Sequence, residues 1–225
     1  TDFGRRLIIP AFVDLHVHAP QYYQTGVGMD KELIPWLNSH TFPLERRFDD
    51  PEFAREAYSS FVDELIRQGT LRACIYATVH KESTEILFDI LASRGIGAFV
   101  GKINTDRNCP HYLKEDTSLS LHETEKLIIS YNDHPMVKPI VTPRFAPTST
   151  EKLLNGLAQL ARKYNVPVQS HLSENTQEIE WVKELFPSQA TYADVYYYFG
   201  LLGQTPTLMA HAIHLEEREL ELIEN

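Results

Sequence analysis

Two histidines separated by a single residue, His16 and His18, are the residues of this chain that most directly suggest chemistry. They follow the apolar run Leu7 to Val13, and the whole stretch 7–18 predicts a strand. Alternate side chains of a strand point to the same face, so both imidazoles would face the same way. Because neutral imidazole is a common ligand of zinc-like ions, this spacing suggests a metal site, although a pair of ordinary strand histidines has the same pattern.

Two further histidines stand at the ends of apolar stretches. His171 ends a predicted strand over 166–172, and His211 ends another over 207–212. Either one alone is more typical of a core histidine with a satisfied hydrogen bond. Glu174 follows His171 at the turn, where its carboxylate could act as a proton shuttle above a metal, or simply favour the start of the next helix.

Strands and helices alternate along the chain, which predicts a parallel sheet covered by helices. The other strands are expected at 71–79, 98–103 and 137–145, and the helices at 50–68, 83–93, 119–131, 149–164, 175–185 and 216–224, with an irregular segment through Asp49. A doubly wound sheet and a (β/α)8 barrel both fit this alternation. The histidines and Arg144 fall at the C-terminal ends of four different strands, which a closed barrel gathers around one mouth. We therefore predict an α/β fold, a (β/α)8 TIM barrel, of which the chain covers about six strand-helix units.

Composition narrows the function classes. The formal charge is -10 over 225 residues, which argues against a nucleic-acid partner, because phosphate binding depends on clustered Lys and Arg. The chain has no run of ~20 apolar residues that would span a membrane and no signal-peptide profile. Its only cysteines, Cys74 and Cys109, indicate neither a disulfide framework nor a thiolate metal site. We expect a cytoplasmic protein.

Several motifs together resemble the guanine deaminase family of the amidohydrolase superfamily. They are H-V-H-A-P-Q at 16–21, T-F-P-L-E-R-R-F at 41–48, F-V-G-K at 99–102, K-P-I-V-T-P-R-F at 138–145, Q-S-H-L-S-E-N at 169–175 and M-A-H at 209–211. The resemblance implies a metal-dependent barrel hydrolase that converts guanine and water to xanthine and ammonia.

The resemblance also implies roles for individual residues. The metal ligands would be His16, His18 and His171, together with an aspartate from the last barrel strand. Glu174 and His211 would be catalytic, as proton shuttle and as the group facing the attacking water. The purine would be bound by Gln21, Arg144 and Phe145. We expect one Zn²⁺ per subunit, with iron as the alternative, guanine as the small-molecule partner, and a homodimer.

One departure from the family pattern is that the sequence ends at Asn225 after the sixth unit. The last two strands and the aspartate ligand are then missing, so residues 1–225 are expected to form one incomplete barrel domain that is inactive by itself. Two alternatives remain open: a related amidohydrolase that deaminates or dechlorinates another heterocycle, and a non-catalytic barrel fragment without a working metal site. Trp36, in the long first segment, is expected to pack under its own loop and is left out of the site.

Overall fold

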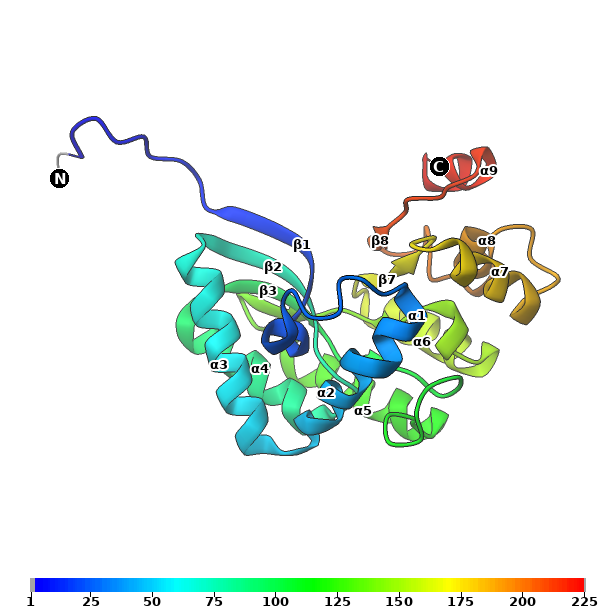
Figure 1. Ribbon diagram of the computed structural model, residues 1–225, viewed down its shortest axis with the longest axis horizontal. Helices are drawn as coiled ribbons and strands as arrows, with labels where there is room; N and C mark the ends of the chain where they lie inside the picture. Colours follow the sequence, from blue (N-terminus) through cyan, green and yellow to red (C-terminus); the bar gives the residue numbers. More distant parts are fainter. Residues whose placement is uncertain (1–2, 225) are drawn as a thin grey trace.

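The structure is a computed structural model that describes residues 3–224, and its strands and helices alternate along the chain (Figure 1). The strands are β1 (Phe12–His18), β2 (Thr70–Tyr76), β3 (Gly97–Gly101), β4 (Ile103–Asn104), β5 (Val137–Pro139), β6 (Thr142–Pro143), β7 (Val168–Leu172) and β8 (Thr207–His211).

Most of the strands are followed in the chain by one or more helices. The α-helices are α1 (Leu33–Trp36), α2 (Phe42–Glu45), α3 (Pro51–Arg67), α4 (Lys81–Arg94), α5 (Thr117–Tyr131), α6 (Glu151–Tyr164), α7 (Thr176–Leu185), α8 (Tyr192–Phe199) and α9 (Glu217–Glu224). Short 3-10 helices are η1 (Ala19–Gln24), η3 (Arg46–Asp49) and η4 (Ala146–Thr148), and η2 (Leu37–Thr41) is a π-helix. None of the helices within 3–224 is long and apolar enough to cross a membrane.

The strands form a curved parallel wall that runs in chain order. Among the described residues, β1 pairs with β2, β2 with β3, β3 with β5, β4 with β6 and β7 with β8, all in parallel. A bridge between Val141 and Val168 joins the β5–β6 side to β7. Across the interior, the Gln169 side-chain amide of β7 donates to the Ile75 carbonyl of β2 at 3.2 Å. Strands in sequence order that also meet across an interior are the geometry of a barrel wall.

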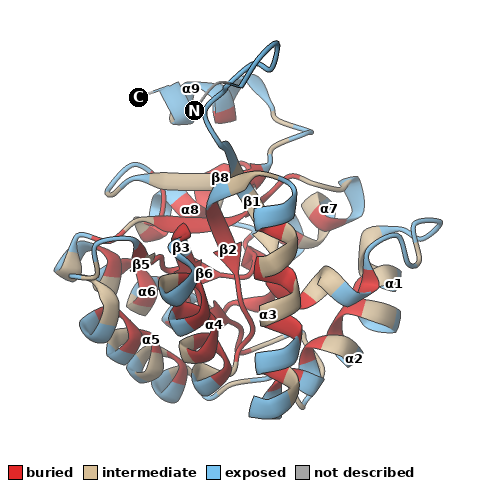
Figure 2. Ribbon diagram, turned by 90° about the vertical axis from the view of Figure 1, so that its left-hand side faces the viewer, coloured by how far each residue is buried: buried red, intermediate tan, exposed pale blue. Residues whose placement is uncertain are grey.

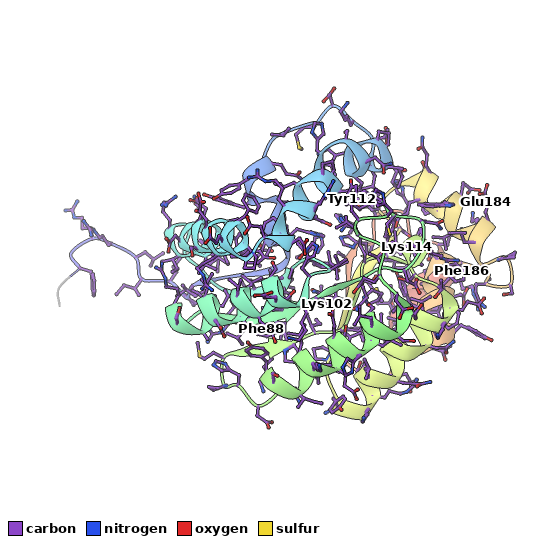
Figure 3. All side chains as sticks on the ribbon, turned by 90° about the horizontal axis from the view of Figure 1, so that it is seen from below. Phe88, Lys102, Tyr112, Lys114, Glu184 and Phe186 are labelled. Carbon is purple, nitrogen blue, oxygen red and sulfur yellow. The ribbon has the colours of Figure 1, made fainter. Side chains whose placement is uncertain are left out.

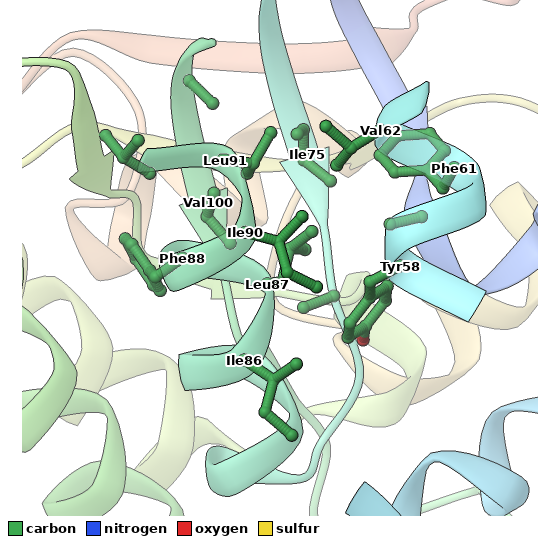
Figure 4. Packing of buried hydrophobic residues seen from close by; sticks show 14 of the residues in the cluster. Tyr58, Phe61, Val62, Ile75, Ile86, Leu87, Phe88, Ile90, Leu91 and Val100 are labelled. Atoms are coloured by element: carbon green, nitrogen blue, oxygen red, sulfur yellow. The ribbon is translucent and has the colours of Figure 1, made fainter. Parts of the chain in front are cut away.

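Helices cover the outside of this wall and bury its apolar side chains. Tyr58 and Phe61 of α3 and Leu87 of α4 pack against Ile75 of β2 and Val100 of β3 (Figure 4). Burying side chains of this size contributes ~1.5–3 kcal/mol each. The strands from β2 to β7 are buried over most of their length, whereas β1 and β8 are more exposed and the helices expose their outer faces to solvent (Figure 2).

A second apolar cluster covers the other half of the wall. Leu153 and Leu157 of α6 and Tyr196 and Phe199 of α8 pack with Val168 of β7. The apolar residues of α6 recur every three to four positions, so one face of the helix turns toward the strands. The two clusters fix the directions of β1, β7 and β8, which carry the histidines.

Local sequence signals set the helix boundaries that matter for the site. The Asp50 side chain accepts a hydrogen bond from the Glu52 backbone N–H at 2.9 Å and so caps α3, with Pro51 at its first position. Asn175 caps α7 in a capping box with Glu178. Glu174 is therefore held immediately before the first turn of α7.

The structure corrects several element predictions. The segment 19–49 is mostly short helical turns rather than irregular, because its apolar residues pack beneath the mouth of the wall. Residues 7–11 have no strand partner among the described residues and are exposed. The strand expected at 137–145 is divided into β5 and β6, and helix α8 was not predicted, since its run of aromatic residues does not resemble an amphipathic helix.

Candidate active site

Four histidines from β1, β7 and β8 converge at the C-terminal ends of their strands. The ring centroid of His16 lies 5.1 Å from that of His18, 4.9 Å from that of His171 and 4.9 Å from that of His211. The Nε2 atoms of His18 and His171 are 3.0 Å apart. Side chains separated by up to 195 positions in the sequence, His16 and His211, are thus brought to one point because parallel strands end at the same edge.

His171 is fixed in one orientation by backbone and side-chain contacts. Its Nδ1 lies 2.6 Å from the Arg144 carbonyl oxygen, which can only accept, so Nδ1 carries the proton and Nε2 keeps its lone pair. The hydroxyl of Tyr196 donates to the His171 carbonyl at 2.9 Å. Hydrogen bonding of the second ring nitrogen to a carbonyl is the usual way in which a metal-binding histidine is oriented.

The surroundings favour the neutral form of every histidine in the cluster. Burial, with a smaller effect from His211, lowers the pKa of His16 to about 4. Burial and the neighbouring histidines lower the pKa of His18 and of His171 well below the usual value, and burial lowers the pKa of His211. Neutral imidazoles with free lone pairs are the form that binds a metal ion.

The donor set fits a divalent ion. One ligand nitrogen each from His16, His171 and His211 lies within 4.8 Å of the other two. The Nδ1 atoms of His16 and His18 are buried without a hydrogen-bond partner among residues 3–224. Two nitrogens bound to one tetrahedral zinc ion at ~2.0–2.1 Å would lie ~3.3 Å apart, close to the separation between His18 and His171. This arrangement brings together the predicted ligands His16, His18 and His171, and adds His211 to the same cluster.

Glu174 stands over the histidine cluster, in the turn between β7 and α7. Its Oε2 lies 3.4 Å from Nε2 of His211. Its backbone N–H donates to the buried Glu178 carboxylate at 3.0 Å, which fixes the turn. Burial, reinforced by the charge of Glu178, raises the pKa of Glu174 to about 7. A carboxyl group with this pKa can both accept and return a proton near neutral pH.

The backbone is strained at the C-terminal ends of β7 and β8, next to the site. Ser173, His211 and Ala212 have positive φ angles of 49°, 70° and 49°. Non-glycine residues rarely adopt this region, and such strain concentrates at functional sites, where the surrounding contacts maintain it. Here the backbone N–H groups of Ile213 and His214 both donate to the Ser173 carbonyl at 3.2 Å, which holds the two strand ends together.

A cavity of about 160 Å³ opens directly onto the histidines. It is lined by all the residues that the sequence singled out, namely His16, His18, Gln21, Arg144, Phe145, His171, Glu174 and His211. Gln21 projects from η1, and its amide forms no hydrogen bond with another described residue, so its donor and acceptor can serve a ligand. Phe145 is 4% exposed and offers an aromatic face.

Arg144 is buried, not at the surface, and its partner was not predicted from the sequence. Its Nη1 donates to both carboxylate oxygens of Glu45, at 2.9 and 2.7 Å. Glu45 is 1% exposed, and burial raises its pKa, which the guanidinium of Arg144 opposes. The motif at 41–48 that contains Glu45 belonged to the family resemblance, but its position in the chain gave no sign of a contact 99 residues away.

Two other parts of the site were missed or excluded at the sequence level. Tyr76, at the end of β2, stacks on His18 with ring centroids 4.4 Å apart. Leu33, Trp36 and Leu37 line the cavity from α1 and η2. Trp36 does pack beneath its own loop, donating to the Val27 carbonyl at 2.9 Å, but it also forms part of the cavity wall. In the sequence, the sign of this part of the cavity wall was a tryptophan followed by an apolar residue, Trp36 and Leu37, in the long first connection.

Comparisons with known proteins agree with this geometry. The profile of the amidohydrolase family matches residues 7–225. The guanine deaminase of Dictyostelium discoideum is 45% identical over 224 residues, which is 99% of this chain and 50% of that protein. A crystal structure of guanine deaminase from C. acetobutylicum with bound guanine superposes with a TM-score of 0.98 at 51% identity, over 99% of this chain and 54% of that one.

The fold prediction is confirmed by the same comparisons. A triazine hydrolase from Arthobacter aurescens shares the fold, with a TM-score of 0.84 at 15% identity over 95% of this chain and 50% of that one. The chain spans about half the length of the curated relatives that it matches.

Proposed function

This chain belongs to the amidohydrolase family, and we propose that the complete protein is a metal-dependent guanine deaminase, which converts guanine and water to xanthine and ammonia. The observation that supports this most is the composition of the cavity. The same cavity is lined by four neutral histidines, by a carboxyl group with a pKa of about 7, and by polar and aromatic side chains that can contact a purine.

His16, His18 and His171 would hold the ion, with His211 beside it. Zinc is the ion that we propose, with iron as the alternative, because imidazole suits both. When bound, such an ion lowers the pKa of a water molecule to ~7 and so makes it nucleophilic at neutral pH.

Glu174 performs the proton transfers in this proposal. It accepts one proton from the attacking water and delivers it to a ring nitrogen of the purine. It then accepts the remaining proton of the added hydroxyl and passes it to the departing amine, so that ammonia leaves and a carbonyl forms. His211, whose Nε2 lies 3.4 Å from Oε2 of Glu174, orients the water beside it. The net reaction exchanges the ring amine for oxygen and consumes one water molecule.

Gln21, Arg144 and Phe145 orient the base. Arg144 presents a planar set of donors suited to a carbonyl, Gln21 offers both a donor and an acceptor, and Phe145 provides a face for stacking.

Ammonia release from a panel of compounds tests the proposal. The complete, zinc-loaded protein is given guanine, adenine, cytosine, guanosine and an amino-substituted triazine, with chloride release measured for a chlorinated triazine. We expect guanine to have the highest kcat/KM. Faster turnover of another compound would reassign the substrate within the family, and the absence of both turnover and bound metal would favour a non-catalytic protein.

We further propose that the protein works in the cytoplasm as a homodimer. Both cysteines, Cys74 and Cys109, are unpaired, as expected in a reducing compartment. On α8, Tyr197 and Tyr198 are 54% and 68% exposed, and such adjacent aromatic side chains are enriched at protein interfaces. Light scattering of the complete protein, with a Tyr198→Ser variant, tests the dimer: a monomeric wild type would exclude it.

A further inference from the structure

Glu45 is a buried carboxylate that the reaction described above does not use. It lies at the end of α2, is 1% exposed, and places both its oxygens within 2.9 Å of Nη1 of Arg144. Phe42, one turn earlier, lies under the same guanidinium, with its ring centroid 5.0 Å from the Arg144 Cζ. One short helix therefore supplies both the charge partner and the aromatic support of Arg144.

This arrangement determines which donors Arg144 can offer to a ligand. The guanidinium has five N–H donors in a fixed plane. Glu45 engages the Nη1 edge, so the Nη2 and Nε donors are left for the cavity that Arg144 lines. Because the side chain has several rotatable bonds, an unpaired Arg144 would lose this orientation.

The pair also sets the charge of the cavity wall. Arg144 beside an ionised Glu45 contributes donors without net positive charge, which suits an uncharged base better than an anion. Removing the carboxylate would leave a buried cation with no partner, a situation in which nearby anions bind strongly.

We propose that Glu45 is a positioning residue that aims Arg144 at the carbonyl edge of the substrate and keeps the cavity selective for an uncharged base. This inference rests on the proposed function, since it assigns a residue to guanine recognition in that same site. Arg144 connects the two halves of the site, because its backbone carbonyl holds Nδ1 of His171 at 2.6 Å while its side chain reaches Glu45.

The role differs from that of an ordinary stabilising ion pair, and the chain contains a matched control. Lys102, which is labelled in Figure 3, forms another buried ion pair with Glu115. The two side chains are 1% and 10% exposed, and Lys102 also donates to the Ile103 carbonyl. Neither residue lines the candidate active site. Glu115→Gln therefore measures the cost of breaking a buried pair that does not contact the substrate.

The experiment compares Glu45→Gln, Glu45→Asp and Glu115→Gln in the complete, zinc-loaded protein. For Glu45→Gln we expect the KM for guanine to rise ~10–100-fold, which corresponds to the loss of one hydrogen bond to a charged group. We expect kcat to change less than ~3-fold and the metal content to stay unchanged. Nitrate should compete with guanine in Glu45→Gln but not in the wild type. Glu45→Asp keeps the charge but draws the carboxylate back, so it should raise KM by a smaller factor and remain insensitive to nitrate.

The outcomes separate this inference from the proposed function. If the wild type releases no ammonia from guanine, the function fails and the role of Glu45 fails with it. If the wild type is active and folded Glu45→Gln has the KM of Glu115→Gln and no sensitivity to nitrate, only the role of Glu45 is overturned. Should Glu45→Gln not fold, Glu45→Asp decides, because an unchanged KM in that variant contradicts the positioning role.

Discussion

Replacing Glu174 with glutamine tests most directly whether this cavity transfers protons. Glutamine keeps the shape and one acceptor near Nε2 of His211, which lies 3.4 Å from the carboxylate, but it cannot carry the proton. A positioned proton-transfer group contributes ~10²–10⁴-fold to the rate, so the activation barrier should rise by ~2.7–5.5 kcal/mol. The competing interpretation, an acid that merely favours the start of α7, predicts intact turnover and a stability loss of ~0.3–1 kcal/mol.

The assay measures ammonia release, metal content and thermal unfolding in the complete protein. Metal content should stay near that of the wild type, because Glu174 is not among the proposed ligands. Glu180→Gln, on the helix α7 that follows Glu174, has a side chain 71% exposed; it is the control and should change none of the three quantities. Turnover of Glu174→Gln close to that of the wild type would refute the proton-transfer role.

Three other perturbations test the metal centre and the wall that supports it. His171→Ala should lose both bound metal and activity, as measured by elemental analysis and ammonia release, because it removes a ligand held in place by the Arg144 carbonyl; retained metal would exclude His171 as a ligand. The metal-free protein should lose stability, measured by urea unfolding, as the pH falls from ~6.5 toward 4. In this range the unfolded chain binds protons that the buried His16, with its pKa lowered to about 4, does not bind. Each such histidine contributes at most ~1.4 kcal/mol per pH unit, and a flat profile would contradict this. Gly101→Ala should lower the free energy of unfolding by ~1–3 kcal/mol or more, since the added Cβ would meet Oγ1 of Thr142 at 1.7 Å, and unchanged urea unfolding would show that the interior can adapt.

The segment 19–49 shows where prediction from sequence failed. Its glycines and prolines suggested an irregular connection, yet the structure forms it into short helices that bring Trp36, Leu37 and Glu45 to the site. Each of these helices is too short to be stable by its own propensity. Contacts with the end of the barrel wall decide their conformation, and those contacts do not show in the local pattern.

The histidines and the strands that bear them could be predicted because their signals are local. An apolar run ending in a polar ligand type is visible within a few residues, and the alternation of strands with helices requires the parallel arrangement that gathers the strand ends. The sequence by itself therefore determined the fold class, the mouth of the barrel as the place of chemistry, and His16, His18, His171, His211 and Glu174 as its candidates.

Only the tertiary structure decided the protonation and pairing of these groups. The pKa of Glu174 near 7 depends on burial and on the charge of Glu178. The orientation of His171 depends on its hydrogen bond to the Arg144 carbonyl. The charge of the cavity wall depends on the contact between Glu45 and Arg144. Burial and electrostatic interaction depend on distance in space, and the residues that supply them here come from elements separated by as many as 99 positions in the chain. No local pattern of residues encodes such distances, so these properties emerge only when the strands and helices have packed together.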